Sequence, residues 1–148
     1  MLIHHRALIL VADGRKYLLL RNLGTASAPQ LAYEGGGEKA NPATHDQGSD
    51  QPGRAFASVG GARSAMEQTD FHQIEEDRFA ADVAGFLGGL AASGDYDQLI
   101  VVAPPRTLAE LRRHYDKAVS SRLVAEIDKD LTKHPVGDIA AILANNGD

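Results

Sequence analysis

The chain has 148 residues, a length typical of one domain with its own core, and its lack of cysteine excludes disulfides, zinc–thiolate sites and thiol nucleophiles. Its formal net charge of −5 disfavours the strongly basic surface of a general nucleic-acid binder, so no DNA partner is expected. Its apolar runs are far shorter than the roughly 20 residues of a membrane span, so we expect a cytoplasmic protein without membrane contact.

Two apolar runs near the N-terminus indicate an antiparallel hairpin. They cover residues 7–12 and 16–23, and Asp13-Gly14 lies between them. Asp-Gly favours a type I′ turn, in which both central residues have positive φ. A shorter run, residues 30–34, is expected to add a third strand that ends at Gly35. The first part of the chain is therefore predicted to be an antiparallel meander.

The stretch from Gly35 to Gln68 is rich in glycine and shows no periodicity. Loops of more than about 15 residues are uncommon inside a domain unless they bind or move something. We therefore expect residues 35–68 to form a long loop, within a single domain of residues 1–148, and to carry the function.

A long helix and a buried strand are predicted after this loop. Apolar residues at helical spacing predict a helix that begins after an N-cap at Asp70 and stops at Ser93-Gly94. Residues 99–103 are apolar, largely β-branched and without polar alternation, which is typical of a strand covered on both faces.

The rest of the chain is expected to continue this alternation. Residues 107–110 have the pattern of a capping box and predict one helix that reaches Val119. Residues 123–131 fit either a helix or a strand, and a strand is preferred because it continues the β-α-β order. Pro135 suits the first turn of a last helix. The chain is thus predicted to be an α/β domain with a mixed sheet, in which the N-terminal meander joins parallel strands through helical crossovers.

Ligands of such sheets tend to lie beyond the carboxyl ends of the parallel strands, which here means residues 103–107. One interpretation is an anion site at the start of the following helix. The other is that Pro104-Pro105 ends the strand and Thr107 caps the helix. Between residues 104 and 123 five basic side chains face two acidic ones, which indicates either a local docking patch or a solvated helix face.

Several separated motifs resemble the bacterial family known as host attachment protein, or protein required for attachment to host cells. The resemblance covers nearly the whole chain and is carried by residues 11–14, 50–54, 60–67, 99–105 and 126–132. That family is similar to the middle domain of archaeal and eukaryotic peptide-chain release factors, which implies an RNase-H-like α/β arrangement.

In those release factors a loop ahead of a long helix carries Gly-Gly-Gln, which promotes hydrolysis of peptidyl-tRNA. Here Gly60-Gly61 are followed by Ala62. The resemblance therefore implies a non-catalytic module, more a binding protein than an enzyme, that associates with the ribosome or with RNA and needs no cofactor. The expected contact residues in the loop are Asp50, Arg54, Gly60, Gly61 and Arg63.

Two other functions stay open at this stage. The carboxylates Asp13, Glu126, Asp128 and Asp130 suggest a hydrolase of phosphodiesters that uses magnesium or manganese, because a strand over residues 123–131 would turn the last three to one face. The alternative is a solvated strand end, with Asp13 explained by its turn. The third hypothesis takes the family name literally, as a factor for attachment to a host, although no export signal, lipid anchor or disulfide supports it.

Overall fold

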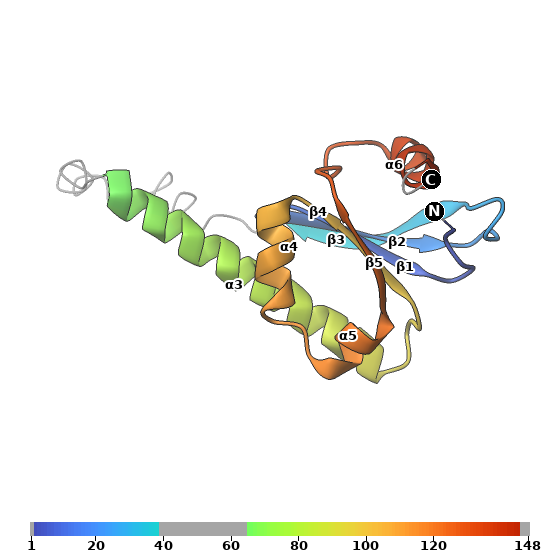
Figure 1. The fold of residues 1–148 in the computed structure, drawn as a ribbon, viewed down its shortest axis with the longest axis horizontal. Coiled ribbons are helices and arrows are strands. Elements are labelled where there is room, and N and C mark those ends of the chain that lie inside the picture. Colours follow the sequence, from blue (N-terminus) through green and yellow to red (C-terminus); the bar gives the residue numbers. More distant parts are fainter. Residues whose placement is uncertain (1, 39–64, 146–148) are drawn as a thin grey trace.

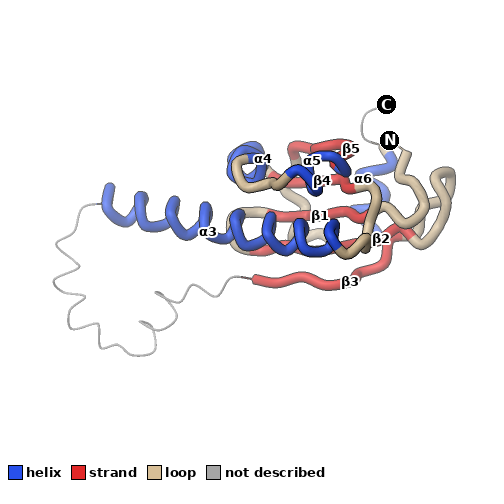
Figure 2. Tube along the Cα trace, turned by 90° about the horizontal axis from the view of Figure 1, so that it is seen from below, coloured by secondary structure: helices blue, strands red, loops and turns tan. Residues whose placement is uncertain are grey.

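In the computed structural model, residues 2–38 and 65–145 are described, with side chains from residue 71 onward in the second range. Within these residues five strands form one mixed sheet in the order β3-β2-β1-β4-β5 (Figures 1 and 2). The strands are β1 (Leu8–Ala12), β2 (Lys16–Asn22), β3 (Leu31–Glu38), β4 (Leu99–Ala103) and β5 (Leu123–Asp128). β1 pairs antiparallel with β2 and parallel with β4, and β5 extends the parallel part. The predicted single α/β domain with an antiparallel meander and parallel crossovers is confirmed.

The turn between β1 and β2 differs from the predicted type I′ turn. No positive φ occurs at Gly14, since among the described glycines only Gly94 has one. Instead, Asp13 Oδ1 accepts hydrogen bonds from the backbone N–H groups of Arg15 and Lys16, both at 2.8 Å. The aspartate side chain thus organises the turn, which removes the need for a left-handed glycine.

Strand β3 and helix α3 (Ala65–Ala92) are both longer than predicted. β3 continues through Gly35, Gly36 and Gly37, which pair with β2, so these glycines do not end the strand. α3 begins five residues before Asp70, which is therefore not its N-cap. The predicted stop is confirmed: α3 ends at Ala92, and Gly94 follows with φ of +76°. Of the predicted loop, residues 39–64 lie outside the described residues.

The predicted helix after β4 is two helices, α4 (Pro105–Arg112) and α5 (Lys117–Arg122). The chain breaks between them because Asp116 caps α5, with its Oδ1 accepting from the Val119 N–H at 2.9 Å. The predicted capping box is wrong as well. Pro104 occupies the N-cap position of α4 without a side-chain hydrogen bond, and Thr107 is buried inside the helix.

The last part of the chain follows the preferred prediction. Residues 123–128 form β5, and α6 (Val136–Ala144) begins directly after Pro135, which is its N-cap residue. No helix in the described part of the chain combines the length and the apolar character needed to cross a bilayer.

The central strands β1 and β4 are buried along their whole length, and they divide the core into two layers. On one face, Leu8 and Leu10 pack with α3, α4 and α5. On the other face, Ile9 and Val11 pack with Ile139 of α6 and with other buried apolar side chains. A strand covered on both faces has no polar alternation, which explains the uninterrupted apolar sequences of β1 and β4.

One charged side chain, Arg21 of β2, is buried within this framework and is only 2% exposed. Its guanidinium donates to both carboxylate oxygens of Glu34 on β3, at 3.0 and 3.1 Å. It also donates to the carboxylate of Asp95 at 2.6 Å and to the backbone carbonyls of Asp95 and Arg6. Arg21 therefore joins the two outer antiparallel strands to the α3–β4 connection and to the segment before β1.

Replacing Arg21 by alanine is expected to lower the free energy of unfolding by about 3 kcal/mol, because five hydrogen bonds and a buried side chain are lost together. Urea denaturation would measure this loss. Glu34→Gln is the control: that carboxylate is 37% exposed, so its change should cost less than about 1 kcal/mol. Equal losses for the two variants would contradict the central role of Arg21.

Candidate functional site

The end of the sheet at which β3 leads into residues 39–64 gathers most of the features that can support a function. Ala12 pairs with Tyr17 and Lys16 pairs with Glu38, so the end of β1, the start of β2 and the end of β3 lie together. β4 runs parallel to β1, so α4 starts at this same end. Helix α3 returns to the sheet here, and its N-terminal half extends beyond the strands (Figures 1 and 2).

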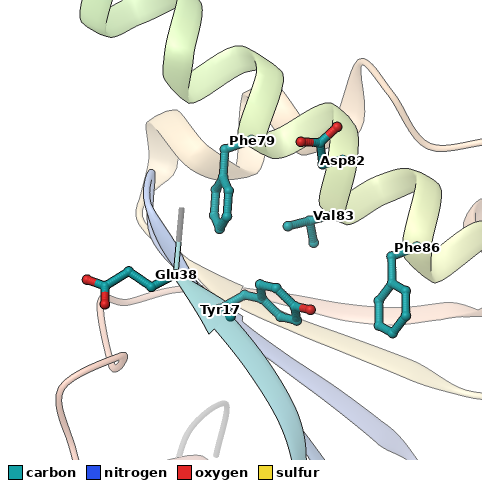
Figure 3. A pocket seen from close by; sticks show the side chains of 7 residues that line it. Tyr17, Glu38, Phe79, Asp82, Val83 and Phe86 are labelled. Atoms are coloured by element: carbon teal, nitrogen blue, oxygen red, sulfur yellow. The ribbon is translucent and has the colours of Figure 1, made fainter. Parts of the chain in front are cut away.

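A groove of about 360 Å³ lies between α3 and the β2–β3 pair at this end. We call it the α3–β3 groove. Its residues are Tyr17, Gly37, Glu38, Phe79, Asp82, Val83 and Phe86. The Tyr17 ring stands between the two phenylalanines, with centroid distances of 6.2 Å to Phe79 and 6.3 Å to Phe86. Figure 3 shows these rings between helix and sheet, with Glu38 at the end of β3 and Asp82 on α3.

Helix α3 is held to α4 by ion pairs and by a hydrogen bond. Asp77 Oδ1 accepts from Arg113 at 2.9 Å and contacts His114 Nε2 at 3.1 Å. The hydrogen bonds from these two side chains lower the pKa of Asp77. The neighbouring residue Glu76 lies 3.9 Å from Arg106. These contacts fix the direction in which the first half of α3 leaves the sheet.

Glu110 of α4 adds a buried carboxyl group to the same helix pair. It is 2% exposed, and its Oε2 accepts from Gln73 Nε2 of α3 at 2.6 Å. Its Oε1 has no hydrogen-bond partner among the described residues. Burial raises the pKa of Glu110. This effect is larger than that of the Gln73 hydrogen bond, which lowers the pKa.

The four carboxylates of the metal hypothesis are only partly brought together. Thr132 Oγ1 donates to Asp13 Oδ2 at 2.8 Å and lies 3.2 Å from Asp130 Oδ1, which unites these two residues. Glu126 of β5 instead forms a bidentate ion pair with Arg112 of α4.

The expected single face of carboxylates fails because β5 ends at Asp128, so Asp130 lies in the connection that follows and not on the strand. The described residues contain no group of three or more His, Asp or Glu side chains placed to hold a metal ion. The geometry therefore gives the metal hypothesis no site in this part of the chain.

The basic side chains of residues 106–122 are mostly engaged within the protein. Arg106, Arg112 and Arg113 face Glu76, Glu126 and Asp77 respectively. Arg122 donates to the backbone carbonyls of Tyr96 and Ala118. These arginines stabilise contacts between α4, α5 and their neighbours, and the predicted local patch is largely neutralised.

The predicted contact residues Asp50, Arg54, Gly60, Gly61 and Arg63, together with Ala62, lie outside the described residues. Sequence reasoning missed the aromatic groove and the buried Glu110. The helical spacing of Phe79, Val83 and Phe86 was visible in the sequence, but their position opposite Tyr17 depends on how the sheet and the helix meet.

Comparison with known families gives one match. Residues 6–143 match the model of the Bacterial archaeo-eukaryotic release factor family 12. The match covers more than half of the chain, so the chain belongs to this family. The description names release factors, as the expected similarity to their middle domain implied, and it gives no support to host attachment. No curated protein matches the chain.

The Glu110 carboxyl should make stability depend on pH. Because its pKa is raised in the folded protein, its proton favours the folded state, and this contribution is lost as the pH rises through the folded pKa. Glu110→Gln is therefore expected to raise the free energy of unfolding at neutral pH by about 1 kcal/mol, because the amide oxygen can still accept from Gln73 while the buried negative charge is removed. The gain should shrink as the pH falls toward the ordinary range of a glutamate.

Chemical denaturation of both proteins across this pH range would measure the difference. Asp97→Asn, at an exposed position, is the control for loss of one negative charge. A Glu110→Gln variant that is less stable than the parent at neutral pH would show that the carboxylate is needed for the α3–α4 contact.

Proposed function

We propose that this chain is a release-factor-like, non-catalytic cytoplasmic module that docks on the ribosome through residues 39–64. The observation that carries the proposal is the family match over residues 6–143. Its release-factor description makes the translation machinery the first partner to consider. The proposed contact residues are Asp50, Arg54, Gly60, Gly61 and Arg63.

The position of this segment in the chain supports the proposal. It joins the end of β3 to the start of α3, and α3 extends beyond the sheet (Figure 1). Phe79 and Val83 of α3 are buried against the sheet, and Gln73, Glu76 and Asp77 contact α4. A helix anchored in this way can hold its N-terminal end away from the body of the domain.

The residue types in the segment suit a contact with ribosomal RNA. Arginine binds phosphate oxygens through a rigid, bidentate group, and Arg54 and Arg63 supply two of these. Gly60 and Gly61 leave no side chain between the backbone and a partner, and they permit conformations closed to other residues. A few arginines on an acidic protein would give binding that weakens as salt is added.

Ala62 is the reason to propose docking without hydrolysis. A methyl group has no hydrogen-bond donor or acceptor, so it cannot position a water molecule or a reacting ester as a glutamine amide can. Purified protein added to ribosomes that carry peptidyl-tRNA is therefore expected to release no peptide above background. Release that depends on Ala62 or its neighbours would overturn this part of the proposal.

Sedimentation of tagged protein from cell lysate on a sucrose gradient tests the docking. The parent protein should migrate with ribosomes at low salt and dissociate at moderate salt. The double variant Arg54→Ala/Arg63→Ala should move to the free fraction at both salts, with a free energy of unfolding within about 0.5 kcal/mol of the parent.

The matched control is Lys117→Glu, which changes the net charge by the same amount at an exposed position in the first turn of α5. A glutamate is favourable at a helix N-terminus, so this variant should fold normally. Equal loss of ribosome binding in the control would assign the effect to net charge. Recovery of the parent protein only in the free fraction would overturn the proposal.

A further inference from the structure

Helix α3 exposes one face along most of its length. Phe79, Val83 and Leu87 bury the inner face of the helix in the core. Helical spacing places another set of residues on the opposite side, and all of them are exposed. We call this set the outer face of α3, and it consists of Phe71, Ile74, Arg78, Asp82, Gly85 and Gly89. At about 1.5 Å per residue, the outer face is about 27 Å long.

The N-terminal part of the outer face is apolar. Phe71 is 40% exposed and Ile74 is 50% exposed. Both lie in the half of α3 that extends beyond the strands (Figure 1). Other residues of this half, Gln73, Glu76 and Asp77, make the polar contacts with α4. Neighbouring large apolar side chains that stay exposed indicate a surface for another molecule.

The C-terminal part of the outer face has no side chains. A Cβ at Gly85 or Gly89 would meet no atom of the described residues within 4 Å, and neither glycine has a positive φ. The glycine between them on the inner side, Gly88, differs, because a Cβ there would lie 2.8 Å from the carboxylate of Asp116. Glycine destabilises a helix interior relative to alanine, so Gly85 and Gly89 lower stability without an internal contact that requires them. They leave a surface that another helix can approach closely.

Two charged residues of opposite sign lie in the middle of the outer face. Arg78 has a side chain that is 67% exposed, and Asp82 follows it by about one turn. A two-fold axis that crosses the face midway between them sets Arg78 of each copy opposite Asp82 of the other copy. Unlike charges then face each other across the axis, in addition to the contacts that each residue makes within its own chain.

We propose that the outer face of α3 binds the same face of a second copy of this chain, with the two helices antiparallel. The axis that pairs the charges also sets Phe71 of one copy opposite Gly89 of the other, and Ile74 next to Gly85. Each large apolar side chain thus meets a position without a side chain, which is the fit that closely packed helices need. In a symmetric dimer each of these contacts is made twice.

The antiparallel direction follows from the order of the residues along the face. Parallel helices would set Arg78 against Arg78 and Phe71 against Phe71, and the glycines would face each other across an unfilled gap. In the antiparallel pair, the half of α3 that extends beyond the strands lies on the half of the other helix that is packed on its own sheet. The two sheets pack on the inner faces, so they lie on opposite sides of the helix pair.

Sedimentation velocity of purified protein over a series of concentrations tests this proposal without ribosomes. One pair of helices is a small interface, so we expect a monomer–dimer equilibrium with a dissociation constant in the micromolar range. A parent protein that stays monomeric at about 200 µM, far above such a dissociation constant, would overturn the proposal.

Gly85→Leu and Phe71→Ala locate the interface. Leucine at position 85 occupies the space that Ile74 of the second copy needs, so dimerisation should weaken about tenfold. The thermal midpoint of the monomer should stay the same or rise, because leucine favours a helix more than glycine and has space there. Phe71→Ala should also weaken dimerisation about tenfold. Unchanged dimerisation of both variants would place the dimer on another surface and overturn the proposal.

A charge exchange tests the antiparallel direction. Arg78→Asp and Asp82→Arg should each weaken dimerisation about tenfold, because like charges then face each other across the axis. An equimolar mixture of the two variants should form dimers again, since every pair across the axis is then of unlike sign. Mixing does not change the charges within either helix, so this recovery cannot arise from the monomers.

Lys133→Asp, at an exposed position in the connection between β5 and α6, is the matched control. It changes the net charge as Arg78→Asp does, and it should dimerise as the parent does. A mixture of the two charge variants that stays monomeric would overturn the antiparallel dimer, whether or not the protein sediments with ribosomes.

Discussion

The buried Arg21 side chain is the interaction on which the arrangement of the outer strands depends. The sheet is apolar at its centre, but β3 contributes glycines and polar residues and cannot be held there by hydrophobic contacts alone. Arg21 replaces those contacts with charge-assisted hydrogen bonds to Glu34 and Asp95. The register of β2 with β3 shifts between Leu19 and Leu20, which leaves Glu34 as the extra residue of a bulge beside the guanidinium. The same group thus secures β3 and the connection that leads from α3 into β4.

The hydrogen bonds of Arg21 also affect how α3 is held at the opposite end of the sheet. Arg21 holds Asp95, just beyond the C-terminal end of α3, to the sheet. Among the described residues, the first half of α3 contacts α4 and the β1–β2 turn, where Glu76 lies close to Gly14. The contacts between the first half of α3 and α4 are polar or charged, and one of them involves the buried carboxyl group of Glu110. These contacts hold α3 to α4 with less apolar burial than in the rest of the core. The strength of the support is therefore sensitive to protonation and to charge, which apolar packing is not.

The sequence identified the elements whose signals are local. The uninterrupted apolar runs of β1 and β4, the stop at Gly94 and the helix after Pro135 each follow from residues close to one another in the chain. The errors arose where a distant contact decides. Asp13 forms its own turn with backbone N–H groups, Asp116 starts a new helix, and the glycines of β3 are held in the sheet by pairing with β2. The acidic residues predicted as one cluster separate for the same reason, since Arg112 engages Glu126 from another element.

Glycine shows most clearly why the candidate site could be predicted only in part. A run of three glycines lowers the propensity for both helix and strand, so local reasoning assigns it to a loop. Tertiary contacts override that preference here, because Gly36 and Gly37 allow β3 to approach Tyr17 more closely than any side chain would permit. The absence of side chains on this strand then leaves space beneath α3, and Tyr17, Phe79 and Phe86 fill it only partly. The α3–β3 groove is therefore a product of the glycines themselves: the residues that suggest a loop in the sequence form, in the folded chain, an edge strand beside a cluster of aromatic rings.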